Sequence, residues 1–231
     1  MEVLLFEKNF DNDFEIIERK GRGHPDTLSD HLAEHLSVEY SNYTKDKFGA
    51  VLHHNFDKVG MLGGASSVTF GNGFITKPIR VLLNGRASTM FADKDIPVRE
   101  ILIGWSKDFF KSRFPSIHPE TDLEFHYNLS HQSSPGKTEE KGSKEGTRSH
   151  WFQPRSLADL QELSNLLSND TSIGVGYAPV SPLESFIIDL ENSLTNGDFK
   201  RENPWIGSDV KLMGLSRGSQ VFMTLCIPQI A

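Results

Sequence analysis

The sequence is short of cysteine, of basic charge and of long apolar runs, and each shortage excludes a class of protein. Among 231 residues only Cys226 is a cysteine, which excludes an internal disulfide framework and a multi-cysteine zinc site, and which fits a reducing compartment. The formal net charge is −7, whereas a general nucleic-acid binder normally carries a basic excess. No stretch approaches the roughly 20 apolar residues that span a bilayer. We therefore expect a cytoplasmic protein that binds neither nucleic acid nor membrane.

Two nucleotide-binding motifs are also missing. Gly21-x-Gly23 lacks the third glycine of a dinucleotide fingerprint, and the sequence has no complete Walker pattern Gly-x-x-x-x-Gly-Lys-Ser/Thr. Helical and strand patterns alternate irregularly, and Gly71-Asn72-Gly73 is a hairpin signal, which favours an α+β fold over a regular parallel α/β fold.

A long helix is the clearest predicted element. From Thr27 onward apolar residues recur every fourth position, Asp26 or Thr27 is suited to cap the helix, and Gly49 is suited to end it. The face that we expect to be buried carries Leu28, Leu32, Leu36 and Tyr40. The other expected strands are Val3–Phe6, Glu15–Arg19, Ala50–Val59, Ser67–Phe70, Ile79–Leu83, Leu123–Tyr127, Lys211–Leu215 and Val221–Ile227, and the other expected helices are Val98–Phe114, Leu157–Leu167 and Ser185–Leu194. Residues 131–150 contain almost nothing apolar and are predicted to form a mobile surface loop.

The most informative stretch is Gly23-His24-Pro25-Asp26, which lies immediately before this helix. The free N–H groups and the dipole of a helix N-terminus favour negative charge, and Lys20 and Arg22 add basic groups nearby. The imidazole and the basic residues are suited to polyphosphate oxygens, and the Asp26 carboxylate is suited to an accompanying cation. A glycine turn with a solvated histidine and a capping aspartate is the alternative interpretation.

Three further groups of residues have the character of a site. On a strand over Ala50–Val59, alternation would place His53, Asn55 and Asp57 on one face. Residues 168–179 concentrate small hydrogen-bonding groups and glycines. Finally, His31-Leu32-Ala33-Glu34-His35 matches the His-x-x-Glu-His pattern of inverted zinc peptidases, but a zinc site would need a third ligand that nothing downstream marks.

Taken together, these stretches resemble one family, the archaeal-type methionine adenosyltransferases, also called S-adenosylmethionine synthetases. The resemblance covers nearly the whole chain. It is carried, in the expected order, by Glu18–Asp26, Phe48–Val59, Gly63-Gly64, Gly85-Arg86-Ala87, Asn169–Pro179 and Asp209–Gly214.

The resemblance implies a reaction in which the sulfur of L-methionine attacks C5′ of ATP and releases triphosphate, which is then hydrolysed to phosphate and diphosphate. It implies that His24 contacts the oxygen that leaves C5′ and that Asp26 is catalytic and holds Mg²⁺; K⁺ is a second candidate cation. The residues expected to contact ATP or L-methionine are Glu18, Lys20, Asp57, Asp170, Thr171, Ser172, Asp209 and Lys211.

The fold implied over residues 1–231 is a set of similar α+β subdomains interleaved along the chain, whose sheets stack in a homodimer with shared active sites. Archaeal members carry Gly-Gln-Gly-Ser where this chain continues into His131, so the resemblance implies no nucleotide contact there. The family also extends beyond the length of this chain, and we expect the final part of its fold to be absent. A non-catalytic ATP- or polyphosphate-binding relative that needs a partner chain is the alternative, with a zinc hydrolase based on His31 and His35 as a distant second.

Overall fold

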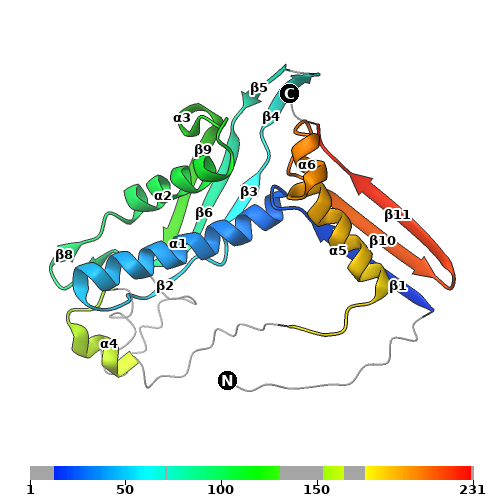
Figure 1. Ribbon diagram of the computed structural model, residues 1–231. Helices are drawn as coiled ribbons and strands as arrows, with labels where there is room; N and C mark the ends of the chain where they lie inside the picture. Colours follow the sequence, from blue (N-terminus) through cyan, green and yellow to red (C-terminus); the bar gives the residue numbers. More distant parts are fainter. Residues whose placement is uncertain (1–12, 71, 131–152, 164–174, 230–231) are drawn as a thin grey trace. The chain divides into compact units, whose positions relative to one another are not determined.

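The computed structural model describes residues 13–70, 72–130, 153–163 and 175–229 (Figure 1). The chain forms two compact units, each assembled from separate stretches of sequence. The first unit comprises Met1–Thr27, Val68–Gly73 and Ile173–Ala231, and the second comprises Leu28–Ser67 and Phe74–Ser172. Helices and strands are mixed in both, which confirms the predicted α+β class.

The first unit is built on an antiparallel sheet with the strand order β1-β10-β11. Its strands are β1 (Phe14–Lys20), β10 (Lys211–Arg217) and β11 (Gln220–Cys226), and its helices are α5 (Pro182–Thr195) and α6 (Asp198–Glu202). Helix α5 covers one face of the sheet (Figure 1). A Cβ on Gly214 would lie 3.1 Å from Cδ1 of Ile187, so a residue without a side chain lets the helix pack closely on the strand.

The face of this sheet away from α5 combines apolar side chains with the charged side chains of Glu18, Lys20, Lys211 and Arg217. Strand residues alternate between faces, so the residues in register with Gly214 face α5 and their neighbours face away from it. The face away from α5 carries four large apolar side chains that are each at least 40% exposed, namely Phe14, Ile16, Met213 and Phe222.

The second unit packs helices on a mixed sheet. Its central strand is β6 (Ile79–Ala87), which pairs antiparallel with β2 (His54–Asn55) and β3 (Gly60–Leu62) and parallel with β9 (Leu123–Ser130). Most of α1 (Pro25–Phe48) and all of α2 (Val98–Arg113) belong to this unit. Their apolar residues form one cluster with those of the sheet, and its largest fully buried members on the helices are Leu32, Leu36, Tyr40, Leu102, Phe109 and Phe110.

The remaining elements are short. Strands β4 and β5 form an exposed two-stranded pair, and β7 pairs with β8. Their bounds, with those of the short helices, are β4 Ala65–Thr69, β5 Asn72–Lys77, β7 Met90–Phe91, β8 Lys94–Asp95, α3 Pro119–Asp122 and α4 Leu157–Leu163.

Most predicted elements are confirmed, and three predictions are wrong. The strand expected over Ala50–Val59 is reduced to β2, because the N–H of Asp57 donates to the side-chain oxygen of Asn55 at 2.9 Å and the chain turns there. The hairpin signal Gly71-Asn72-Gly73 is confirmed, because β4 and β5 pair, but the second strand of the hairpin is β5 and not the expected strand Ile79–Leu83, which belongs to β6.

The third error concerns the start of the long helix. Helix α1 begins at Pro25, so Asp26 and Thr27 lie in its first turn and do not cap it. Its end after Phe48 is as predicted, because Gly49 takes a left-handed φ of 80° and donates its N–H to the carbonyl of Lys45 at 2.8 Å. The predicted strand Val3–Phe6, the predicted loop 131–150 and the end of the predicted helix Leu157–Leu167 lie outside the described residues.

Candidate functional site

The candidate site lies where β1 leads into α1, in the first unit. Beyond Lys20 the chain stays in contact with the segment before β10: Gly21 N–H donates to the carbonyl of Val210 at 2.6 Å, and Gly23 N–H to the carbonyl of Ser208 at 2.9 Å. A Cβ on Gly23 would lie 2.3 Å from Oγ of Ser208 and 2.6 Å from its carbonyl carbon. Only glycine therefore allows this approach, which fixes the turn that carries His24.

His24 provides the N-cap of α1. Its Nδ1 accepts the backbone N–H of Asp26 at 3.2 Å, which satisfies one of the free donors of the helix start. An Nδ1 that accepts a hydrogen bond carries no proton, so the neutral imidazole is protonated at Nε2. His24 can therefore donate a hydrogen bond from Nε2 while its side chain, only 18% exposed, is held in place by the helix.

Four charged side chains next to His24 form a continuous row of ion pairs of alternating sign, which we call the ion row; it consists of Asp26, Lys20, Glu18 and Lys211. Nζ of Lys20 lies 2.6 Å from Oδ2 of Asp26 and 3.2 Å from Oε1 of Glu18. Nζ of Lys211 lies 3.1 Å from Oε2 of Glu18. The strand register explains the row, because Lys20 and Lys211 are direct partners at one end of the β1–β10 ladder.

The ion row shifts the proton affinities of its members in the expected directions. The hydrogen bond from Lys20 lowers the pKa of Asp26, and the bonds from Lys211 and then Lys20 lower the pKa of Glu18. The pKa of Lys20 is raised, first by Asp26 and then by Glu18. All three groups are therefore charged at neutral pH, as a site for a polyphosphate and a metal requires.

The structure thus brings together five of the predicted site residues, namely Glu18, Lys20, His24, Asp26 and Lys211. Asp209 is exposed in the segment that contacts the glycine turn. Asp57 belongs to the second unit, where it pairs with Lys58 at 2.8 Å, and the broken strand does not give it the shared face with His53 and Asn55 that was expected. Asp170, Thr171 and Ser172 lie outside the described residues.

Ser208 is a structural partner of the site that was not among the predicted site residues. Its carbonyl and side chain meet Gly23 directly. The spacing Gly21-x-Gly23 at the end of a strand is the signal that could have indicated a second backbone in close contact.

The zinc alternative finds no support in the described part of the chain. His31 is exposed on α1, whereas the His35 ring packs 5.5 Å from the ring of Phe109. Within the described residues no group of three or more histidine, cysteine, aspartate or glutamate side chains is arranged to hold a metal ion.

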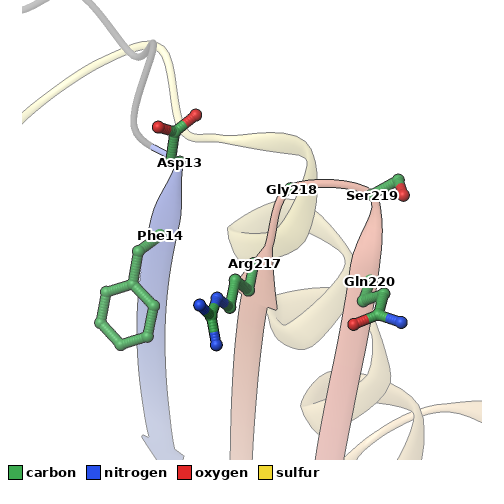
Figure 2. Close-up of a pocket in the computed structure, with 6 residues that line it drawn as sticks. All are labelled: Asp13, Phe14, Arg217, Gly218, Ser219 and Gln220. Carbon is green, nitrogen blue, oxygen red and sulfur yellow. The ribbon is translucent and has the colours of Figure 1, made fainter.

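A shallow recess lies at the other end of the same sheet. It is lined by Asp13, Phe14, Arg217, Gly218, Ser219 and Gln220 (Figure 2). Phe14 and Arg217 are partners at the opposite end of the β1–β10 ladder from Lys20 and Lys211, so this recess is separate from the ion row.

Comparison with known proteins identifies the family. A family model described as S-adenosylmethionine synthetase (AdoMet synthetase) matches residues 2–148 and 151–231. The chain belongs to this family. The match includes both strands of the ion row and the turn that bears His24, as the motif resemblance implied.

Individual relatives carry names that agree with this family assignment. The chain is 37% identical over 221 residues to an S-adenosylmethionine synthase of Pyrobaculum neutrophilum, covering 94% of this chain and 50% of the relative. It is 35% identical over 227 residues to a probable S-adenosylmethionine synthase of Aquifex aeolicus, covering 96% and 52%. The chain therefore spans about half the length of the curated relatives that it matches. No helix among the described residues is long and apolar enough to cross a membrane.

The ion row suits the divalent metal usual in this synthetase family. Mg²⁺ prefers carboxylate and phosphate oxygens and is commonly held by one or two carboxylates plus the phosphates of a substrate. Asp26, 64% exposed, and Glu18 offer such oxygens, whereas no larger ligand group is present in the described residues. This donor set fits a metal that arrives with a polyphosphate better than a permanently bound one.

Proposed function

We propose that this chain forms part of a methionine adenosyltransferase site that makes S-adenosylmethionine from ATP and L-methionine. The observation that carries the proposal is the position of His24 beside the ion row, with Nδ1 accepting the Asp26 N–H so that Nε2 is the nitrogen that can donate. The family assignment supports it. Because the chain spans about half the length of its curated relatives, the activity of the whole protein is part of the proposal.

The reaction needs little acid–base catalysis. The methionine thioether is already nucleophilic, so an S–C5′ bond forms while the C5′–O bond breaks and its electron pair leaves with the triphosphate; water then cleaves the triphosphate to phosphate and diphosphate. The demands are in-line orientation and stabilisation of the charge on the leaving oxygens. His24 donates from Nε2 to the oxygen that leaves C5′, and Lys20 and Lys211 provide ammonium groups for the phosphates.

When bound, Mg²⁺ neutralises charge on the phosphate oxygens, and Asp26 with Glu18 would hold it. K⁺ is a second candidate cation in the proposal. Asp57, Asp170, Thr171, Ser172 and Asp209 remain proposed contacts of ATP or methionine. The single cysteine supports a cytoplasmic location.

We also propose that the protein forms a homodimer with shared active sites. The face of the sheet away from α5 supports this, because Phe14, Ile16, Met213 and Phe222 are exposed there beside the ion row. A second copy of the same sheet would cover it. Analytical ultracentrifugation of F222E should show loss of the dimer; an unchanged sedimentation coefficient would count against this interface.

The test of the activity is direct. The purified chain is incubated with ATP, Mg²⁺ and L-methionine, and S-adenosylmethionine and released phosphate are measured by mass spectrometry and colorimetry. We expect H24A to keep its circular dichroism spectrum and ATP binding while the transfer rate falls by about 10²-fold or more, the usual contribution of one positioned hydrogen-bond donor in a reaction of this type.

H31A is the matched control, because His31 is exposed on the same helix, and it should retain full activity. If the chain binds ATP but forms no S-adenosylmethionine, it is a polyphosphate-binding relative that needs a partner chain, and the activity proposal fails. Equal turnover in H24A and wild type would remove the role assigned to His24.

A further inference from the structure

We infer that Lys20 serves as a stand-in cation, which occupies the metal position at Asp26 until a polyphosphate brings its own metal. The inference rests on the proposed function for the identity of the polyphosphate. Its observation is the position of the Lys20 ammonium, which lies 2.6 Å from Asp26 and 3.2 Å from Glu18 and so lies between the two carboxylates that are suited to hold Mg²⁺.

An ammonium group and a metal ion exclude each other at this point. Mg²⁺ lies about 2.0–2.1 Å from its oxygen ligands. A metal bound between Asp26 and Glu18 would therefore take the place of Nζ of Lys20, and the charges of the two cations would repel strongly at so short a distance.

The charge balance explains why a polyphosphate resolves this conflict. Two basic and two acidic side chains make the ion row neutral as a unit, so it has little attraction for a free divalent ion. Triphosphate adds several negative charges at once, and the flexible Lys20 side chain can leave Asp26 for a phosphate oxygen. Lys211 remains paired with Glu18 from the neighbouring strand. The metal then enters at Asp26 together with the phosphates, and the site does not bind metal without substrate.

The experiment measures metal binding rather than turnover. Mn²⁺ replaces Mg²⁺, and its free concentration is followed by electron paramagnetic resonance during titration of the protein alone. We expect K20M to bind Mn²⁺ at least about tenfold more tightly than wild type, because the two carboxylates lose the competing positive charge. Binding of inorganic triphosphate at saturating Mg²⁺, measured by calorimetry, should be several-fold weaker in K20M, because a phosphate partner is lost.

These opposite changes distinguish a stand-in cation from damage to the fold, which would weaken both kinds of binding. K107M is a matched control: Lys107 pairs with Glu120 at 2.7 Å and its side chain is 28% exposed, against 30% for Lys20, so removal of this lysine should change neither measurement. K20R keeps the positive charge and should resemble wild type. The gain of K20M should disappear in the double variant K20M/D26N.

Equal Mn²⁺ affinity of K20M and wild type would overturn the inference, as would a gain that survives in K20M/D26N. Neither measurement contains methionine or depends on product. A chain that forms no S-adenosylmethionine but shows the opposite changes would therefore retain the role of Lys20 while losing the proposed activity, and an active chain without those changes would do the reverse.

Discussion

The two units of the molecule differ in what they bury. In the second unit a broad cluster of aromatic and aliphatic side chains packs beneath α1 and α2, and the buried Tyr40 hydroxyl donates to the carbonyl of Ser88 at 2.6 Å. This unit also buries the Asp159 carboxylate, which is paired with Arg155 at 3.1 Å. In the first unit the apolar cluster is small and α5 covers only one face of the sheet. This unit also buries a charge, the Glu191 carboxylate, which is 6% exposed and paired with Arg19.

The difference separates stability from chemistry. Close apolar packing is sensitive to the volume of each side chain and does not depend on charge. The stability of the second unit should therefore respond mainly to substitutions that change side-chain volume. The ion row needs exposed charges on a rigid backbone, and the first unit provides them at the end of a strand ladder and at the start of a helix. Substitutions that change the charge of a side chain should therefore have their main effect in the first unit.

The largest effect is expected for F109A in the second unit. Phe109 is 1% exposed, its ring packs against Phe110 and His35, and the Arg113 guanidinium lies 3.7 Å from its centre. Loss of a buried ring and the resulting cavity should lower the free energy of unfolding by about 3–5 kcal/mol, as measured by urea denaturation followed by circular dichroism.

F70A is the control for ring size, because Phe70 is 90% exposed and its loss opens no cavity. Mn²⁺ and triphosphate binding by F109A at low temperature should match wild type. A substantial loss of either in a folded F109A sample would contradict the separation of the two functions.

The sequence predicted most of the elements that show strong periodicity or clear end signals. The spacing of Leu28, Leu32, Leu36 and Tyr40 predicted the buried face of α1, and Gly49 predicted its end. These features depend on neighbours along the chain, so the pattern is visible without a structure. The prediction of a strand over Ala50–Val59 was wrong because its residues suit a strand, while the Asn55 side-chain oxygen accepts the N–H of Asp57 and the chain turns there.

The site was predictable in its residues but not in its connections. The motif around His24 and the family resemblance indicated Glu18, Lys20, Asp26 and Lys211. That Lys211 joins Glu18 depends on the register of β1 with β10, which pairs residues almost two hundred positions apart. A long-range register of this kind leaves no local signal in either strand.

The second effect in size is expected for R19A in the first unit. Nη2 of Arg19 donates to Oε2 of Glu191 at 2.9 Å, and the carboxylate also accepts from the Thr195 hydroxyl at 3.0 Å. Without Arg19 the buried carboxylate loses its cation and one hydrogen bond, which should lower the free energy of unfolding by about 1–3 kcal/mol in the urea midpoint analysis.

E191Q is the companion variant. It removes the charge and keeps a hydrogen-bond acceptor for Arg19, so it should cost less than R19A. If E191Q proved the more costly of the two, the buried charge would not be the source of the effect, and the contrast between the units would lose one of its supports.

The smallest effect is expected from acid and concerns the half-buried His54 imidazole of the second unit. Its Nε2 lies 2.8 Å from the Ser37 hydroxyl, its Nδ1 lies 2.8 Å from the carbonyl of Leu52, and its ring packs on Tyr40 and Phe56.

Burial lowers the pKa of His54 below its ordinary value near 6.5. Above that pH the folded and unfolded chains both hold this residue neutral, and its contribution to stability is complete. As the pH falls below 6.5 the unfolded chain takes up the proton first, so the free energy of unfolding declines until the pH passes the lower, folded-state pKa. Urea midpoints measured between pH 8 and pH 5 should therefore decline less in H54Q than in wild type. The control H31Q leaves the His54 imidazole in place, so its midpoints should decline as those of wild type do. Equal slopes in H54Q and wild type would show that the His54 ring is not the source of this pH dependence.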